Sequence, residues 1–190
     1  MKFLSNYKVI LSSVLFLFLL SSCSNELETE TYENSSLVTV KVQGTQSTLS
    51  KANIEILDVQ FRVEEDETDP NAWISLNPVN IGIHDFTKIT NDQVVTFVDF
   101  EEVPSKYIYS IRLVLGDHNT VVKNGVEYDL NMDSEYENAS VNSVEKQLIA
   151  NNLYDFVIEL DVDESIKISS EGQADFNPKM NTMMRLFSLF

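Results

Sequence analysis

The stretch YIYSIRLVLGDHNTVVKNGVEYDL, residues 107–130, decides the fold. Its first part alternates with the period of two that indicates a β-strand, and the alternation puts Tyr107 and Tyr109 on the same face as Ile111. Both faces are partly apolar, which is typical of a strand in the middle of a sheet. Asn124-Gly125 follows between two apolar runs, and Asn-Gly is the strongest short hairpin signal because both turn residues need a positive φ angle. The stretch therefore predicts a central strand and then a hairpin in which Asn124 and Gly125 have a structural role.

Short alternating runs continue on both sides of this stretch. Between Ile56 and Leu57 the alternation changes phase, which predicts a β-bulge or a bend between two sheets. No run shows the 3.6 period of a helix. Many short strands, few glycines and no helices predict an all-β fold, an antiparallel two-sheet β-sandwich. The expected strands are a first run from residue 37 and runs at 53–63, 72–76, 80–86, 93–103, 106–115, 120–122, 126–130, 141–150, 153–162, 165–168 and 183–187.

The N-terminus reads as a targeting segment. Two lysines precede an apolar run at residues 9–20, and small residues lead to Cys23, the single cysteine of the chain. This order is typical of a secretory signal peptide, and the run is short for a transmembrane helix. Residues 20–23, Leu-Ser-Ser-Cys, resemble the lipobox of bacterial lipoproteins, which implies cleavage before Cys23 and a lipid on its thiol. The alternative is ordinary signal cleavage that leaves an idle thiol.

These features divide the chain into residues 1–22 as signal peptide, 23–36 as lipidated cysteine and tether, and 37–190 as one β-sandwich domain. The tether is rich in glutamate and poor in apolar residues, which favours disorder. Acidic residues directly after a lipidated cysteine also resemble an export signal to the outer surface. The predicted location is therefore the cell envelope, as an outer-membrane lipoprotein exposed at the surface, with the membrane as a partner through the lipid anchor.

The charge of the chain excludes one class of partner. Residues 1–22 hold two basic residues and no acids, so the remainder has 11 basic and 30 acidic residues and a formal charge of −19. Nucleic acid and anionic lipid headgroups are repelled by such a charge. With one cysteine an intramolecular disulfide is impossible, so stability must come from the core.

Several short motifs resemble those of one known family. The similarity is strongest at residues 111–116, IRLVLG, and continues to the Asn-Gly turn; the other matching positions are Trp73, Leu76, Asn119, residues 121–122, 159–161 and 165–166, Gly172, Phe176 and Pro178. Over residues 38–185 the chain resembles domain-of-unknown-function family 4382, whose members are mostly envelope lipoproteins of Gram-negative bacteria. The resemblance implies a transthyretin-like or immunoglobulin-like sandwich and no established activity.

Two acidic segments are candidates for a metal site. Asp129, Asn131 and Asp133 have the first three spacings of a calcium loop, although serine stands where that loop has its glycine and its final glutamate. Glu65, Asp66 and Glu67 lie in an acidic run between two expected strands, and Ca²⁺ takes six to eight oxygen ligands. The alternative for both is a solvated loop tip. Calcium is the one cofactor these patterns suggest.

Aromatic residues and one arginine are the remaining candidates. Trp73 and Tyr136 are candidate ligand-binding residues because aromatic rings stack on sugars, but a sandwich core also uses aromatics. Arg112 projects from the expected central strand, and a buried guanidinium must be paired. We expect it to be structural, with Glu159 or Asp161 as its partner.

The sequence shows no catalytic signature: no G-x-S-x-G, no phosphate-binding glycine loop and no nucleophilic cysteine away from the lipid end. It therefore predicts no catalytic residues and no enzyme, but a binding or adhesion module for glycan or protein. One alternative is a structural subunit that packs through its sheet edges; another is a glycan hydrolase. A binding module predicts exposed aromatics around one concave patch, whereas a structural subunit predicts a bare apolar edge strand, near Met183.

Overall fold

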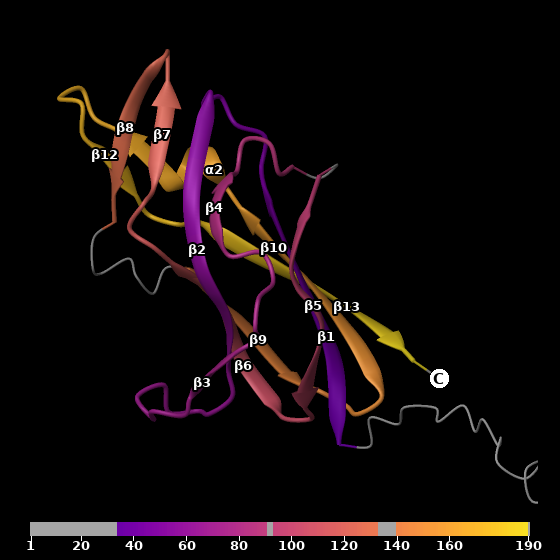
Figure 1. Ribbon diagram of the computed structural model, residues 1–190. Helices are drawn as coiled ribbons and strands as arrows, with labels where there is room; N and C mark the ends of the chain where they lie inside the picture. The colour runs from indigo at the N-terminus through magenta and orange to yellow at the C-terminus, as the bar shows by residue number, and fades with distance from the viewer. Residues whose placement is uncertain (1–33, 91–92, 133–139, 190) are drawn as a thin grey trace, which may run out of the picture. The chain divides into compact units, whose positions relative to one another are not determined.

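The computed structural model describes residues 34–90, 93–132 and 140–189 and consists almost entirely of β-strands in two sheets (Figure 1). This confirms the predicted all-β sandwich. The four-stranded sheet has the order β13 (Met180–Ser188), β10 (Asn152–Leu160), β1 (Ser35–Gly44) and β5 (Val95–Pro104). In the nine-stranded sheet the order is β11 (Ile166–Ile168), β12 (Ala174–Phe176), β8 (Val126–Asn131), β7 (Thr120–Lys123), β2 (Lys51–Arg62), β6 (Tyr107–Leu115) and β9 (Val141–Gln147), with β3 (Trp73–Ser75) and β4 (Gly82–Asp85) also paired to β2.

Most strand pairs are antiparallel, as predicted, but two are parallel. β1 runs parallel to β10 over eight residue pairs, and β12 runs parallel to β8. Parallel neighbours need a long crossover, and the chain between β1 and β10 provides one by forming most of the nine-stranded sheet. Two other elements were not predicted. β12 is too short to show an alternation, and α2 (Val162–Ser165) is a single turn capped by Asp161, whose side chain accepts a hydrogen bond from the Glu164 N–H.

The structure confirms both local signals read from the sequence. At the phase change in β2 the register against β6 shifts between Ile56 and Asp58, and Leu57 is 47% exposed. The β7–β8 hairpin turns at Asn124 and Gly125 with φ angles of 54° and 78°. Glycine reaches such angles without steric cost, which explains its position in the turn.

The predicted faces of β6 are wrong at its start. A register shift against β9 between Ile108 and Ser110 changes the phase, so Ile108 and Ile111 are both fully buried while Tyr107 is exposed. The bulge reverses the faces of the two tyrosines relative to the predicted alternation. It places aromatic side chains on the outer face of the nine-stranded sheet.

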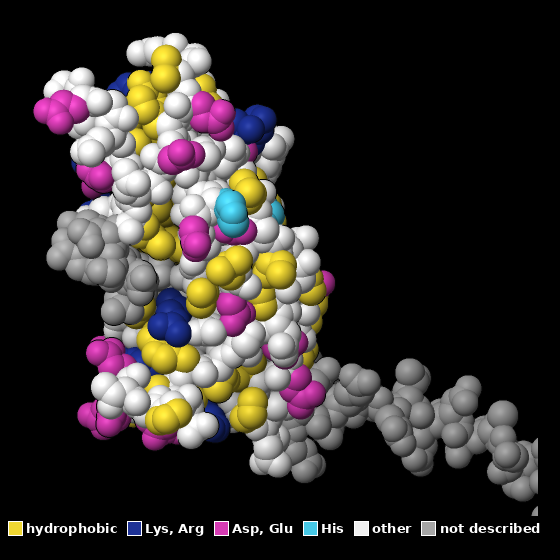
Figure 2. All heavy atoms as spheres, turned by 60° about the vertical axis from the view of Figure 1, so that its left-hand side comes forward, with side chains coloured by type: hydrophobic (Ala, Val, Ile, Leu, Met, Phe, Trp, Pro, Cys, Tyr) yellow, Lys and Arg dark blue, Asp and Glu magenta, His cyan; other side chains and the backbone are white. Residues whose placement is uncertain are grey.

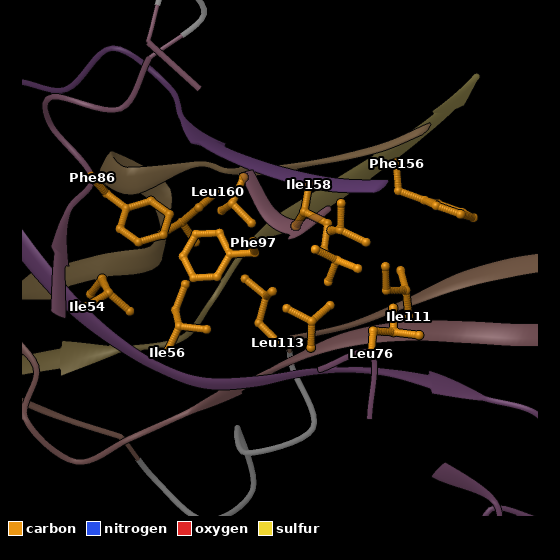
Figure 3. Packing of buried hydrophobic residues seen from close by; sticks show 14 of the residues in the cluster. Ile54, Ile56, Leu76, Phe86, Phe97, Ile111, Leu113, Phe156, Ile158 and Leu160 are labelled. Atoms are coloured by element: carbon orange, nitrogen blue, oxygen red, sulfur yellow. The ribbon is translucent and has the colours of Figure 1, made fainter. Parts of the chain in front are cut away.

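The core lies between the two sheets (Figure 3). Ile54 and Ile56 of β2 point toward Phe97 of β5 and Leu160 of β10. Each fully buried side chain of this kind contributes about 1.5–3 kcal/mol relative to an exposed one. Because inward residues fill this layer, the outward residues of each sheet are available for function. Within the described residues, no helix combines the length and the apolarity needed to span a membrane.

Candidate functional site

A groove lies on the outer face of the four-stranded sheet. Along β1 and β10 the inward residues are buried in the core, so Thr39 and Lys41 of β1 and Asp155 of β10 fall on the opposite face. The groove has a volume of about 280 Å³, and its other lining residues are Thr96, Asp99, Phe100, Leu153 and Phe187. Each of its four strands contributes at least one side chain. The groove is thus a product of the sheet order and not of one loop.

The floor of the groove contains a buried ion pair. Lys41 Nζ donates to Asp155 Oδ2 at 3.0 Å, and Asp155 is only 6% exposed. The other carboxylate oxygen, Oδ1, is buried and accepts no hydrogen bond within the described part of the chain. A buried polar atom without a partner costs free energy, so a hydroxyl or amide donor brought to this position would be favoured.

Two phenylalanines stand at the sides of the groove. Phe100 of β5 is 56% exposed and Phe187 of β13 is 48% exposed. Phe100 has a φ of 51°, which is strained for a bulky side chain, at a register shift of β5 against β1. Its N–H donates to the Thr39 hydroxyl at 3.4 Å, a bond that helps to hold this conformation. Strain of this kind is typical of functional sites.

The opposite end of β10 carries a second hollow of about 450 Å³, between Glu159 and Lys179. Its acids have partners within the fold. Glu159 Oε2 accepts a hydrogen bond from Gln43 Nε2 at 2.6 Å, and Asp161 caps α2. The acidic groups of the larger hollow are therefore used within the fold, whereas Oδ1 of Asp155 in the groove has no partner in the described chain.

The structure places Trp73 and Arg112 together, a contact that the sequence did not predict. Arg112 points outward from the nine-stranded sheet, because its neighbours Ile111 and Leu113 fill the core. Its Nε and Nη2 donate to Gln60 Oε1 at 2.9 and 2.7 Å, and its guanidinium lies 3.8 Å above the Trp73 ring.

The predicted pairing of Arg112 with Glu159 or Asp161 is therefore wrong, since Glu159 is on the other sheet and Asp161 follows that strand. Desolvation lowers the pKa of Arg112, and the nearby carboxylate of Asp58 opposes this. Trp73 therefore remains a candidate ligand-binding residue only together with Arg112, which covers its ring.

Among the described residues, no three His, Cys, Asp or Glu side chains gather at either candidate calcium segment. Asp129 and Asn131 belong to the extended strand β8. This part of the candidate segment is therefore an extended strand and not a loop, and its third residue, Asp133, lies outside the described residues.

In the other segment, Asp66 accepts hydrogen bonds from the Thr68 side chain and backbone, which lower its pKa. Glu67 lies 3.8 Å from Arg62, and the backbone of Glu65 accepts a hydrogen bond from that arginine. The solvated loop accounts for these contacts.

Cys23, Asp133 and Tyr136 lie outside the described residues, so the predictions made for them stand as predictions. Sequence reasoning missed the groove residues Lys41, Phe100, Asp155 and Phe187. One signal was present: Asp155 is an acid between Tyr154 and Phe156 in an apolar strand. Such an interruption indicates a charge that needs a partner.

Residues 35–178 match the family model described as Domain of unknown function (DUF4382), so the chain belongs to that family. The comparisons found no match among curated proteins or among solved structures.

Proposed function

We propose that this member of the DUF4382 family is a lipid-anchored, non-enzymatic binding module whose groove takes a glycan. The carrying observation is the unpartnered Oδ1 of buried Asp155 in a groove between two exposed phenylalanines. Sugar rings present apolar faces to aromatic side chains and hydroxyl groups to polar ones, and this groove offers both kinds of contact. Its lining holds two carboxylates, those of Asp99 and Asp155, and Asp155 is already paired with Lys41.

The anchor is proposed from the sequence. Residues 20–23 resemble a lipobox, and the acidic segment after Cys23 would hold the domain away from the bilayer. Burial of acyl chains contributes about 0.8 kcal/mol per CH₂, so several chains on one cysteine anchor a protein firmly. In cell fractionation, Cys23→Ala should move the protein from the membrane to the soluble fraction. Persistence of the variant in the membrane fraction would contradict the anchor.

A glycan array tests the groove. Protein beginning at Ser24 is applied once with calcium and once with a chelator, together with Phe100→Ala and Asp155→Asn. We expect both variants to lose the signal of the unmodified protein. Leu57→Ala is the matched control, because Leu57 is a similarly exposed apolar side chain on the other sheet. Binding that survives both groove variants would contradict the assignment of the glycan site to the groove. Loss of binding with the chelator would show that binding requires a metal ion.

One observation favours the structural subunit as a second candidate. β13 is an edge strand with Met183, Leu186 and Phe187 exposed, and it carries no proline and a single charged residue, Arg185. Edge strands of soluble proteins are usually protected by charges, prolines or bulges. Met183→Lys with Leu186→Lys should abolish crosslinked assemblies on intact cells if β13 packs against a partner. Unchanged crosslinking would remove this candidate.

A further inference from the structure

The outer face of the nine-stranded sheet carries two arginines stacked on aromatic rings. Arg112 of β6 lies 3.8 Å above Trp73 of β3, and Arg62 of β2 lies 5.3 Å from the centre of the Tyr109 ring. Tyr107 packs edge to face against Tyr109 at 4.8 Å. Figure 2 shows a cationic side chain among hydrophobic ones near the middle of this face. Two cations thus gather with three aromatic rings in a strongly acidic protein.

Arg112 is held in place without a direct carboxylate partner. Gln60 accepts two hydrogen bonds from it through Oε1 and donates through Nε2 to Asp58 Oδ2 at 2.7 Å. The other oxygen of Asp58 accepts from Ser75 Oγ at 2.8 Å. The nearest carboxylate is therefore occupied, and the Gln60 amide stands between it and the guanidinium. The orientation of Arg112 is fixed by neutral groups, and its charge is not neutralised by contact within the described chain.

Arg62 also has donors to spare. Its Nη1 donates to the Glu65 carbonyl at 3.0 Å, its contact with the exposed Glu67 is 3.8 Å long, and its Nε is buried without a partner. A guanidinium has five N–H donors. In the ladder Arg62 faces Ser110 and Gln60 faces Arg112, so the two arginines are diagonal neighbours, about 7–8 Å apart at their backbones.

We propose that this face is a binding site for the oxyanion of an acidic sugar, a carboxylate or a sulfate group. Rigid, part-buried guanidinium groups with unused donors match the two oxygens of such a group bidentately. The tyrosine pair beside them offers a surface for the sugar ring. The site is separate from the groove over Asp155 and does not rest on the function proposed there.

Trp73 provides the test because it is the single tryptophan of the chain and is covered by Arg112. The purified whole protein is titrated with sodium glucuronate, with glucose and with sodium sulfate, at constant ionic strength set by sodium chloride, while tryptophan emission is recorded. We expect a saturable change with glucuronate and none with glucose, which has the same ring without the carboxylate. If sulfate also changes the tryptophan emission, the site binds oxyanions in general. If glucuronate changes the emission and sulfate does not, the site is specific for a carboxylate.

Variants separate binding from structure. Arg112→Gln should weaken glucuronate binding about tenfold or more, because hydrogen bonds to charged groups are the strong ones. Arg62→Gln should weaken it less and keeps the test valid if the first variant does not fold. Arg185→Gln, on β13 of the other sheet, is the matched control and should bind normally. No saturable change with either oxyanion, an equal change with glucose, or unaltered binding by both β2–β6 arginine variants would overturn the proposal.

Discussion

The outer faces of the two sheets each carry a charged side chain, a buried one on the four-stranded sheet and a partly buried one on the other, and the two differ in how they are paired. On the four-stranded sheet, Asp155 is paired directly with Lys41 and keeps one oxygen without a donor. On the nine-stranded sheet, Arg112 is paired with the neutral Gln60 and has no carboxylate in contact within the described residues. Both faces arise from the same alternation of inward and outward side chains. Single side chains on a shared framework therefore decide whether a face offers acceptors or donors.

The largest effect should come from the core that both faces share. Phe61 of β2 and Phe156 of β10 meet edge to face at 5.3 Å and join the sheets. Phe156→Ala should lower the free energy of unfolding by about 3–5 kcal/mol, because it removes buried surface and leaves a cavity. Urea unfolding measures this, with exposed Leu57→Ala expected to stay within about 0.5 kcal/mol. Equal effects of the two variants would mean that the sheets do not pack through Phe156.

A smaller loss is expected from Lys41→Met, which keeps the apolar stem and removes the charge. Asp155 then stays buried without its ion pair to Lys41, and we expect a loss of about 2 kcal/mol in urea unfolding, since Lys41 is itself partly exposed. Asp155→Asn in the same background should recover part of the loss, because the neutral amide costs less to bury. Without such recovery, the cost of Lys41→Met would lie in packing and the contrast between the faces would fail.

Gln60→Met tests the other side of the comparison. It removes the amide between Asp58 and Arg112 but keeps a side chain of similar length. We expect a loss of about 1 kcal/mol, because Arg112 is only partly buried and can reach water or Asp58 instead. Trp73 emission should change at the same time, as the guanidinium is no longer held over the ring. A loss larger than that of Lys41→Met would reverse the ranking of the two faces.

The parts of this molecule that sequence could predict are local. The Asn124-Gly125 turn and the bulge after Ile56 each depend on neighbouring residues. The parallel pairing of β1 with β10 depends on a crossover of more than a hundred residues, and no local pattern reports it. The groove likewise combines Lys41, Phe100 and Asp155, which meet only when three distant strands are ordered in one sheet. Arg112 was correctly expected to need a partner. The partner is Gln60, and it could not be predicted because it depends on which strand lies beside β6 and in which register.

The smallest predicted effect concerns an exposed ion pair, and it sharpens the role of burial. His118 Nδ1 lies 2.8 Å from Glu55 Oε2, and the ring is largely exposed, unlike the Lys41–Asp155 pair. The hydrogen bond between them raises the pKa of His118 from its ordinary 6.5 and lowers the pKa of Glu55 from 4.5.

The stabilisation from protonated His118 is complete below pH 6.5 and is lost as the pH rises through its raised pKa in the folded protein. The stabilisation from ionised Glu55 is present above pH 4.5 and is lost as the pH falls through its lowered pKa. The pair should therefore stabilise the fold most between these values. The Tm of His118→Gln should lie slightly below that of the unmodified protein at pH 5.5, by less than for Gln60→Met, and the difference should disappear in alkaline buffer. Because the backbone N–H of residue 118 still donates to Glu55 in the variant, this comparison isolates the ring charge. A difference that stays constant up to pH 9 would mean that the ring contributes by its shape, and exposure would then not explain why this pair is weaker than the buried one.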